Sequence, residues 1–551
     1  MLRTSLRRCH RVLIGSTLRH FRSSIGTFDG SITIGDVTIP SGPRGSGRPD
    51  LVPKLPSRLT QLDEVHTSLP PCHFSHLRWM IQKDLALQQD FLLLGTPELA
   101  RERRHLILLY AALLDREVEY ISLSKDTSEA DLKQRKEVTN RGTVYVNQAP
   151  VRAAINGRLL ILDGLEKAER NVLPTLNNLL ENREMPLDDG SMLVSPDVYD
   201  AHKIGISPAN DIAGVQIHRV HPDFRVAALG SLSVGESVSL DPPLRSRFQG
   251  RLASAVEVGD ILVAASAESN GLLDATTFKN LVQLVGEVPR GVPLQSIHDA
   301  VRYLEKYQQS IAPQAALNAH GINFNGDMVG ADDVMSPLKI NHGQKKGKIS
   351  EFVETKTTRA IRDLIIAGFE SGNRAVVCVG PKGCYKSAVA RETARVYGAK
   401  VELFSLHPDM TSRDLLMVRG TDAESGDTVW RETPLTRAVQ QGTWVILDGI
   451  DKLRSDTLSS LALLMEQGWV NLPDGKRIHA NENFRCIGIA HPPGDKPWIT
   501  PESKSMFHWI EVAPLPSDEL GDILMDLYPS LDEKVLAMIL QLRDQLDQSA
   551  R

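Results

Sequence analysis

The chain has 551 residues, of which 41% are hydrophobic and 24% charged, and its formal net charge is −5. This length exceeds one ordinary domain, and the composition is that of a globular chain with more than one hydrophobic core. No apolar run approaches the eighteen or so residues of a membrane span. The longest candidate, Leu106–Leu114, predicts a buried helix instead. We therefore expect no transmembrane segment.

The first residues have the composition of a mitochondrial targeting sequence. Six arginines, interleaved with Ser and Thr, precede the first acidic residue, Asp29, and Leu2, Leu6 and Leu13 fall on one helical face. Such a segment predicts a transit peptide over residues 1–27 and a location in the mitochondrial matrix, with a disordered basic tail as the alternative. Removing six arginines and no acid would move the net charge from −5 to about −11, which argues against nucleic acid as a partner. The five cysteines show no Cys-x-x-Cys spacing, so neither a zinc site nor a disulfide framework is predicted.

An internal repeat organises the rest of the chain. The differences 380 − 95, 448 − 163 and 474 − 189 all equal 285, which places three pairs of similar segments in one register. These pairs are Phe91–Gly95 with Val376–Gly380, Leu160–Lys167 with Val445–Lys452, and Asp189–Gly190 with Asp474–Gly475. A fourth pair, 223–230 with 483–490, has the smaller offset 490 − 230, or 260, so the first copy carries 285 − 260, about 25, extra residues near Val194–Val215.

Each copy alternates short apolar runs with helical stretches. This alternation predicts a parallel β-sheet covered by helices on both faces. In each copy the first run ends in glycine and a later run ends in aspartate, Asp163 or Asp448. Because ligands of such sheets bind at the carboxyl ends of the strands, we expect the functional residues there.

The second copy carries a phosphate-binding loop. Gly380, Lys386 and Ser387 match the pattern Gly-x-x-x-x-Gly-Lys-Ser/Thr, after an apolar run and before a helical one. Backbone N–H groups of such a loop surround phosphates, the lysine adds positive charge, and the hydroxyl coordinates Mg²⁺. The candidate nucleotide-binding residues are Gly380, Pro381, Lys382, Gly383, Cys384, Tyr385, Lys386 and Ser387, and the candidate metal ligands are Ser387 and Asp448.

One position of this loop departs from the pattern. Tyr385 stands where the second glycine is expected, and glycine there permits an unusual backbone conformation. A tyrosine must accept strain of about 1–3 kcal/mol or turn its ring outward. Since Gly380 and Gly383 remain, we expect nucleotide binding at lower affinity. A decayed site and a chance glycine-rich turn are the alternatives.

The corresponding loop of the first copy, Gly95–Glu102, has no second glycine and no Gly-Lys pair. It also contains an acid, Glu98, which would repel phosphate. We expect a structural role for it rather than phosphate binding.

The aspartates that end the central strands, Asp163 and Asp448, suit a Mg²⁺ site. Both are followed by glycine rather than by the glutamate that usually positions the attacking water. Glu166 and Asp451 are the nearby carboxylates that could replace it. Because loss of a general base costs a factor of roughly 10²–10⁴ in rate, we expect slow hydrolysis.

Two arginines of the first copy, Arg245 and Arg247, have no arginine counterpart in the second copy, where Lys504 lies at the matching place. A guanidinium directed at a neighbour's γ-phosphate offsets charge in the transition state. One copy keeps the loop and the other keeps the arginines, which favours a site shared across an interface. The candidate catalytic residues are Asp448, Arg245 and Arg247. A surface salt-bridge cluster is the alternative for the arginines.

With these motifs the chain resembles the dynein-related, MoxR-like branch of AAA+ ATPases. The segments that carry the resemblance are Gly157–Pro174, Asn177–Met185, Leu240–Phe248 and His76–Trp79, together with the loop of the second copy. The resemblance implies ATP as ligand, ATPase activity and ring-type self-association. It identifies no protein client.

We therefore expect an α/β fold with two tandem P-loop NTPase modules of AAA+ type and small helical lids. The expected parts are a small β element and linker over 28–70, module 1 over 71–330, a linker over 331–350, and module 2 with an incomplete lid over 351–551. The expected function is ATP binding with slow Mg²⁺-dependent hydrolysis at module 2, assisted by arginines of a neighbouring module. The alternative is a nucleotide-binding assembly scaffold without hydrolysis.

Overall fold

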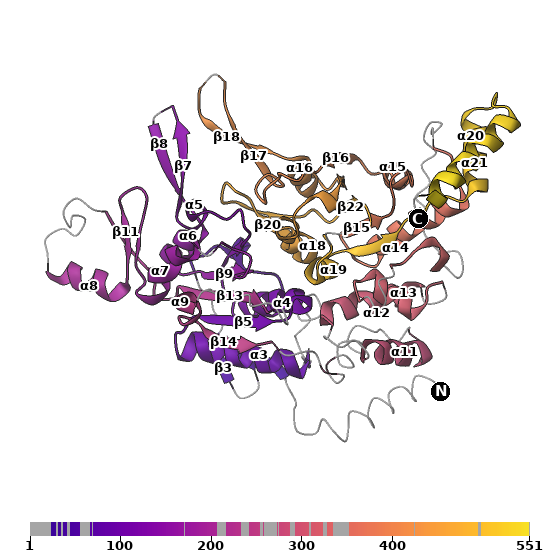
Figure 1. Cartoon of the computed structure of the whole chain (residues 1–551). Helices are drawn as coiled ribbons and strands as arrows, with labels where there is room; N and C mark the ends of the chain where they lie inside the picture. The colour runs from indigo at the N-terminus through magenta and orange to yellow at the C-terminus, as the bar shows by residue number, and fades with distance from the viewer. Residues whose placement is uncertain are drawn as a thin grey trace.

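The computed structural model shows two α/β modules joined by a helical lid (Figure 1). It describes residues 24–28, 31–34, 37–40, 45–55, 67–68, 70–140, 142–169, 171–205, 216–232, 242–253, 257, 260, 273, 275–286, 292–307, 310–322, 328–333, 352–423, 425–493 and 498–549. Residues 1–23 and 334–351 lie outside this part, and with them most of the expected transit peptide and linker. No helix within the described ranges is long and apolar enough to cross a membrane.

A small antiparallel sheet precedes module 1. Its strands are β1 (Ser24–Phe28), β2 (Ser31–Ile34), β3 (Val37–Pro40) and β4 (Thr67–Ser68), in the order β3-β2-β1-β4. The β element expected near residue 31 is therefore present. Its first strand begins at Ser24, inside the segment 1–27 that the composition assigns to a presequence.

Module 1 is built on a five-stranded parallel sheet in the order β14-β5-β13-β9-β6. The strands are β5 (Phe91–Gly95), β6 (Val118–Ser122), β9 (Leu159–Asp163), β13 (Arg225–Ser231) and β14 (Gln249–Leu252). The helices of its core are α3 (Pro71–Ile81), α4 (Ala100–Leu113), α5 (Glu129–Leu132), α6 (Ala149–Asn156), α7 (Asn177–Glu181), α8 (Pro196–Gly205) and α9 (Pro242–Arg245). All five residues of β9 are buried, as expected of a central parallel strand covered on both faces.

Module 2 repeats this sheet in the order β16-β19-β22-β15-β23. Its strands are β15 (Ala375–Val379), β16 (Val401–Ser405), β19 (Trp444–Asp448), β22 (Arg485–Ala490) and β23 (His508–Glu511). Its helices are α14 (Lys356–Glu370), α15 (Lys386–Tyr397), α16 (Pro434–Gln441), α17 (Ser455–Ser459), α18 (Ala462–Gln467), α19 (Pro501–Met506), α20 (Ser517–Leu527) and α21 (Glu533–Ser549). In both sheets the strand that leads into the predicted loop, β5 or β15, lies between the fourth and fifth sheet strands in chain order. This shared arrangement confirms the predicted tandem α/β fold.

Small strand pairs project from each sheet and were not predicted. Module 1 carries β7 (Gln134–Thr139) with β8 (Gly142–Asn147), and module 2 carries β17 (Met417–Thr421) with β18 (Thr428–Glu432). The two hairpins contact each other, since the indole N–H of Trp430 donates to Glu137 at 3.0 Å. Shorter strands are β10 (Met185–Pro186), β11 (Met192–Val194) and β12 (Ile217–Arg219) in module 1, and β20 (Trp469–Asn471) and β21 (Arg477–His479) in module 2.

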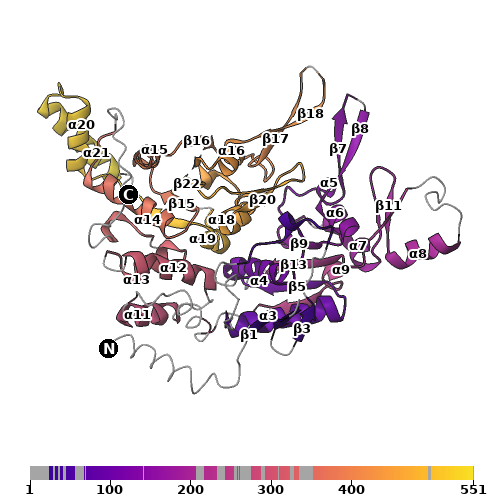
Figure 2. The ribbon, with the colours of Figure 1, turned by 180° about the vertical axis from the view of Figure 1, so that it is seen from behind.

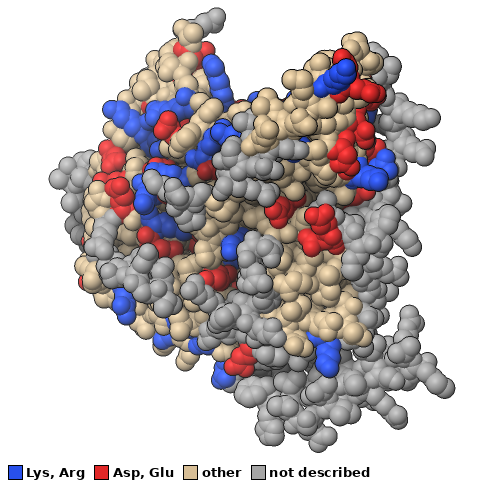
Figure 3. Space-filling view, turned by 45° about the vertical axis from the view of Figure 1, so that its right-hand side comes forward, with Lys and Arg blue, Asp and Glu red and all other residues tan. Residues whose placement is uncertain are grey.

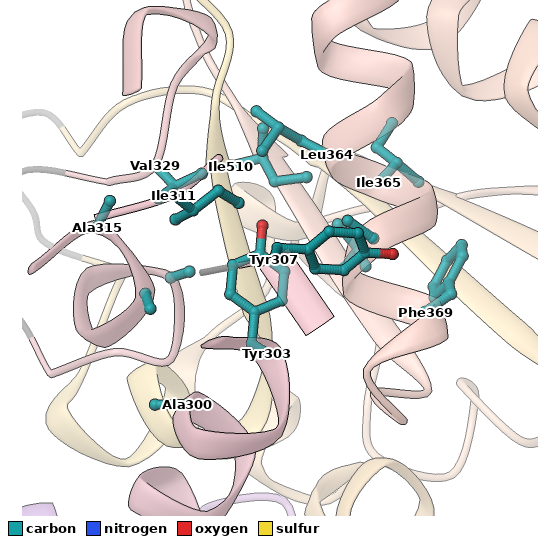
Figure 4. Close-up of a cluster of buried hydrophobic side chains, with 14 of the residues drawn as sticks. Ala300, Tyr303, Tyr307, Ile311, Ala315, Val329, Leu364, Ile365, Phe369 and Ile510 are labelled. Carbon is teal, nitrogen blue, oxygen red and sulfur yellow. The ribbon is translucent and has the colours of Figure 1, made fainter. Parts of the chain in front are cut away.

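The lid of module 1 packs on module 2. It consists of α11 (Ala275–Gly286), α12 (Leu294–Tyr307) and α13 (Pro313–Ala319). Tyr303 and Tyr307 of α12 lie among Leu364 of α14 and Ile510 of β23 in one buried cluster (Figure 4). Because this cluster also holds residues of β15 and β22, the lid and the second sheet share a single hydrophobic core.

A second seam joins the modules at α4. Leu463 and Trp469 of module 2 belong to the core cluster of module 1, and the Trp469 ring meets Tyr120 edge to face at 6.1 Å. The two modules are thus packed together at both seams. On the face shown in Figure 3, basic and acidic side chains both occur around the hollow at the top of the view.

Candidate nucleotide-binding site

The loop of module 2 runs from the end of β15 to the start of α15. Gly380 has to be glycine, because a Cβ atom there would collide with the carbonyl oxygen of Val512. Tyr385, the residue before α15, has φ +54° and ψ 11°, which is the left-handed conformation that L-residues avoid. The loop therefore keeps the backbone shape that glycine normally provides, and tyrosine bears the strain.

Lys386 lies inside this loop. Its ammonium group donates to the carbonyl oxygens of Gly380 at 2.6 Å and Pro381 at 2.5 Å, and the residue is only 7% exposed. Burial lowers the pKa of Lys386, and the nearby Asp451 and Asp448 act in the opposite direction. A buried cation held only by main-chain carbonyls is suited to receive an anion.

The acidic side of the site comes from the end of β19. Asp448 is half-buried, and within the described ranges no group is hydrogen-bonded to its carboxylate. After the turn at Gly449, Asp451 accepts a hydrogen bond through Oδ2 from Nδ1 of His491 at 2.9 Å. The other oxygen of Asp451, Oδ1, is buried with no partner among the described groups. Sequence reasoning missed His491, although it directly follows the strand that the repeat had identified.

These residues fit Mg²⁺. The ion prefers oxygen ligands and typically binds one or two carboxylates together with waters and phosphate oxygens. The Ser387 hydroxyl, the uncommitted Asp448 carboxylate and the orphaned Asp451 oxygen are ligands of this kind. In the part of the chain that the structure describes, no three His, Cys, Asp or Glu side chains are grouped to hold a metal without such help.

The loop of module 1 is filled by the protein's own side chain. The Arg103 guanidinium donates to the Thr96 carbonyl at 2.8 Å and to the Ser231 hydroxyl at 2.6 Å. A Cβ atom at Gly95 would lie 2.5 Å from its Nη1. Thr96 corresponds to Pro381 in the repeat (381 − 285). Arg103 therefore donates to the Thr96 carbonyl in module 1, as Lys386 donates to the matching Pro381 carbonyl in module 2.

Arg101, which corresponds to Lys386 in the repeat (386 − 285), turns out of the loop. It donates to Asp299 at 2.7 Å and to the Ser505 carbonyl at 3.0 Å. Glu102, in the place of Ser387, pairs with His73 instead. Neither side chain therefore points into the loop, where a phosphate would bind.

The acidic residue of module 1, Asp163, is also committed. It accepts hydrogen bonds from Tyr120 and from Arg104, the latter at 3.3 Å. Arg104 is fully buried and also binds two carboxylates of module 2, Glu466 at 2.8 Å and Glu502 at 2.5 Å.

Lys167 of module 1 adds to this group, since its ammonium lies 2.5 Å from Glu502. We call the five charged side chains the junction cluster: Arg104, Asp163, Lys167, Glu466 and Glu502. Glu502 lies in the first turn of α19. The two helices begin at Pro242 and Pro501, an offset of 259, so Glu502 corresponds to Pro243, the second residue of α9. Module 2 therefore directs a glutamate of α19 at the degenerate site of module 1, whereas the matching segment of module 1 carries arginines. The signal in the sequence was a pair of arginines, Arg103 and Arg104, where the second copy has the apolar residues Ala388 and Val389 (388 − 285 and 389 − 285).

The structure does not bring Arg245 and Arg247 to Lys386. Arg247 pairs with Glu181 of α7 and donates to the Pro243 carbonyl, both within module 1. In Figures 1 and 2, α9 lies beside β13 in module 1, well apart from α15 in module 2. The loop and the arginines of one chain cannot form a single site.

Two parallel sheets of this strand order, each with a loop after its first strand along the chain and an aspartate ending its third, define a P-loop protein of the AAA+ class. The family model described as AAA domain (dynein-related subfamily) matches residues 90–248 and 375–507, together more than half of the chain. The chain belongs to this family.

Among curated proteins, the chain is similar to von Willebrand factor A domain-containing protein 8 of Mus musculus, with 32% identity over 95% of this chain and 31% of that protein. It is also similar to Protein NorQ of Paracoccus denitrificans, with 30% identity over 21% of this chain and 43% of that protein. Midasin of Giardia intestinalis is 23% identical over 38% of this chain and 4% of its own length. The chain thus spans less than a third of the mouse relative.

Proposed function

We propose that the chain binds one ATP with Mg²⁺, at module 2, and hydrolyses it slowly. The observation that carries this proposal is the contrast between the two loops. Lys386 lies in its loop with no carboxylate bonded to it among the described residues, whereas Arg103 and the junction cluster fill the corresponding site of module 1. Family membership supports nucleotide as the ligand.

The residues of module 2 have distinct roles in this proposal. The loop amides and the amino end of α15 bind the phosphates, and Lys386 balances their charge. Ser387 and Asp448 hold Mg²⁺, which supplies further positive charge to the β- and γ-phosphates. Asp451, oriented by His491, is the carboxylate placed to orient a water molecule. Without a glutamate directly after Asp448, turnover is slow.

Arginine assistance comes from a second copy of the chain. Arg245 or Arg247 of one chain would act at the loop of another, because α9 and α15 are apart within one chain. This arrangement requires self-association, as in the ring-type assemblies common among AAA+ proteins. The client of such an assembly is not identified by the site.

The matrix location rests on the arginine-rich first residues. Full-length precursor incubated with isolated mitochondria should be shortened at its amino end and become protected from added protease. Precursor that stays accessible at full length would contradict this location.

A nucleotide-binding scaffold without hydrolysis is the second candidate. Two observations favour it: the strained backbone of Tyr385 and the glycine that follows Asp448. Binding of ATP with no release of phosphate would support this candidate over the first.

Turnover measured against protein concentration tests the enzyme proposal. Specific activity should rise with concentration in the wild type, because Arg245 or Arg247 acts between copies, and combining Arg245→Ala with Arg247→Ala should lower it by at least tenfold. Lys386→Ala should abolish turnover, whereas Lys400→Ala, at an exposed lysine of the same module, should not. Equal rates for the wild type and Lys386→Ala would overturn the proposal.

A further inference from the structure

A cavity of about 600 Å³ lies at the junction of the two modules, at the amino ends of the module 2 strands. The phosphate-binding loop is at the opposite, carboxyl ends. Residues of both modules line the cavity, among them Arg302 of the first lid and Arg374 and Arg485 of module 2. We call it the arginine cavity.

Two of these arginines are neighbours on adjacent strands. The register pairs Ala375 with Cys486, so Arg374 and Arg485 stand side by side one position earlier, on strands about 4.8 Å apart. Arg374 donates to the Glu466 carbonyl at 3.3 Å, and Arg485 donates to the Glu482 and Phe484 carbonyls at 2.7 Å each. Within the described part of the chain, neither guanidinium has a carboxylate partner.

This pairing is unfavourable by itself. Like charges on directly opposed positions of neighbouring strands destabilise a sheet. Burial lowers the pKa of Arg374, and the charges of Arg485 and Arg302 lower it further. Burial also lowers the pKa of Arg485.

The third arginine comes from the other module. Arg302 of α12 reaches Gly372, where a Cβ atom would lie 3.6 Å from its Nη1. It shares the carboxylate of Asp299 with Arg101. The remaining acids of the lining are Glu466, which is bound to Arg104, and Glu482. The lining thus holds more positive than negative charge.

Module 1 provides an internal comparison. Its counterpart of Arg485 is Arg225 (485 − 260), which lies 3.5 Å from Asp84 and is also near Asp90. The counterpart of Arg374 is Gln89 (374 − 285). The fold therefore does not require two unpaired arginines at this edge, and only module 2 has them.

We propose that the arginine cavity binds a small phosphate-bearing anion. Guanidinium groups bind phosphate oxygens in bidentate fashion, and three of them here converge from two modules. The volume lies within the usual range of small-molecule sites. A ligand there would connect the lid of module 1 to the sheet of module 2 and stabilise their junction.

The test uses the full chain with Lys386→Ala, so that the phosphate-binding loop of module 2 is silent. Tripolyphosphate should bind this protein in titration calorimetry and raise its melting temperature. Arg374→Gln or Arg485→Gln in the same background should weaken binding by about tenfold or more, since each removes a charge-assisted pair of hydrogen bonds. Arg302→Gln tests the contribution of the lid in the same way.

Arg431→Gln, at an exposed arginine of β18, is the matched control and should bind as the parent does. Without tripolyphosphate, Arg374→Gln should melt no lower than the parent, because it relieves repulsion, whereas a structural arginine would lower the melting temperature when removed. The proposal is overturned if tripolyphosphate does not bind the Lys386→Ala chain, or if Arg374→Gln and Arg485→Gln bind it unchanged. Equal binding of citrate would overturn the assignment to phosphate.

Discussion

Tyr385 shows how a single residue can keep the shape of a phosphate loop at a cost in stability. Its ring packs against the large shared core, and its backbone holds the left-handed conformation. Replacing it with alanine or with glycine removes the ring in both cases, but only glycine relieves the backbone.

Tyr385→Gly should therefore be more stable than Tyr385→Ala by about 1 kcal/mol in free energy of unfolding, measured by urea denaturation. The glycine variant should also bind ATP more tightly than the alanine variant. An alanine variant that is equally stable would show that the residue bears no strain.

The residues of the module 2 site were predictable, because the spacing of Gly380, Lys386 and Ser387 follows directly from loop chemistry. Arg103 was not. The repeat aligns Arg101 with Lys386, and nothing in the spacing shows that the residue two positions later turns back into the loop.

Among the elements, α9 and α19 occupy the same place in the repeat but differ in charged residues. Arg245 ends α9 and Arg247 follows it, whereas α19 holds Glu502 and Lys504. The arginines of α9 are exposed or half-buried, whereas Glu502 of α19 is buried in the junction cluster. The repeat matched these two segments but did not predict this contact, since it depends on how one module packs on the other. The hairpins β7–β8 and β17–β18 were missed for a related reason: their polar strands are stabilised largely by each other.

Removing the charge of Glu502 should loosen the junction. Glu502→Gln removes the carboxylate that Lys167 binds and one of the three that Arg104 binds, and should lower the free energy of unfolding by about 3 kcal/mol. Glu533→Gln, at an exposed position of α21, should change it by less than about 0.5 kcal/mol. Urea denaturation of the two variants measures both values, and equal stability would mean that the junction cluster contributes nothing.

Acid should weaken the same contact. Burial opposes ionisation of Glu502, but Lys167 and Arg104 outweigh it and lower its pKa below the ordinary 4.5. A carboxyl group whose pKa is lower in the folded than in the unfolded chain stabilises the fold. This stabilisation is complete above the pKa of the unfolded chain and is lost as pH falls toward the pKa of the folded chain.

The stability difference between the wild type and Glu502→Gln should thus be constant near neutral pH and shrink below about pH 4.5. Melting curves at roughly pH 7, 4 and 3 measure this difference. A difference of the same size at all three values would contradict the assignment.

In the whole molecule, two copies of one fold have diverged, so that one keeps the candidate nucleotide-binding loop and the other forms a packed junction. The sequence repeat predicted both sheets and their order of motifs. It did not predict that the first lid shares a core with the second sheet, because hydrophobic periodicity does not identify which surface a helix covers. The asymmetry leaves one loop per chain available to nucleotide.

Titration calorimetry with Mg²⁺ and ATP tests this asymmetry most directly, in a full chain that carries Arg374→Gln so that the arginine cavity does not contribute. Our account predicts one binding site per chain, lost in Lys386→Ala. Two sites per chain, or binding that survives Lys386→Ala, would contradict it.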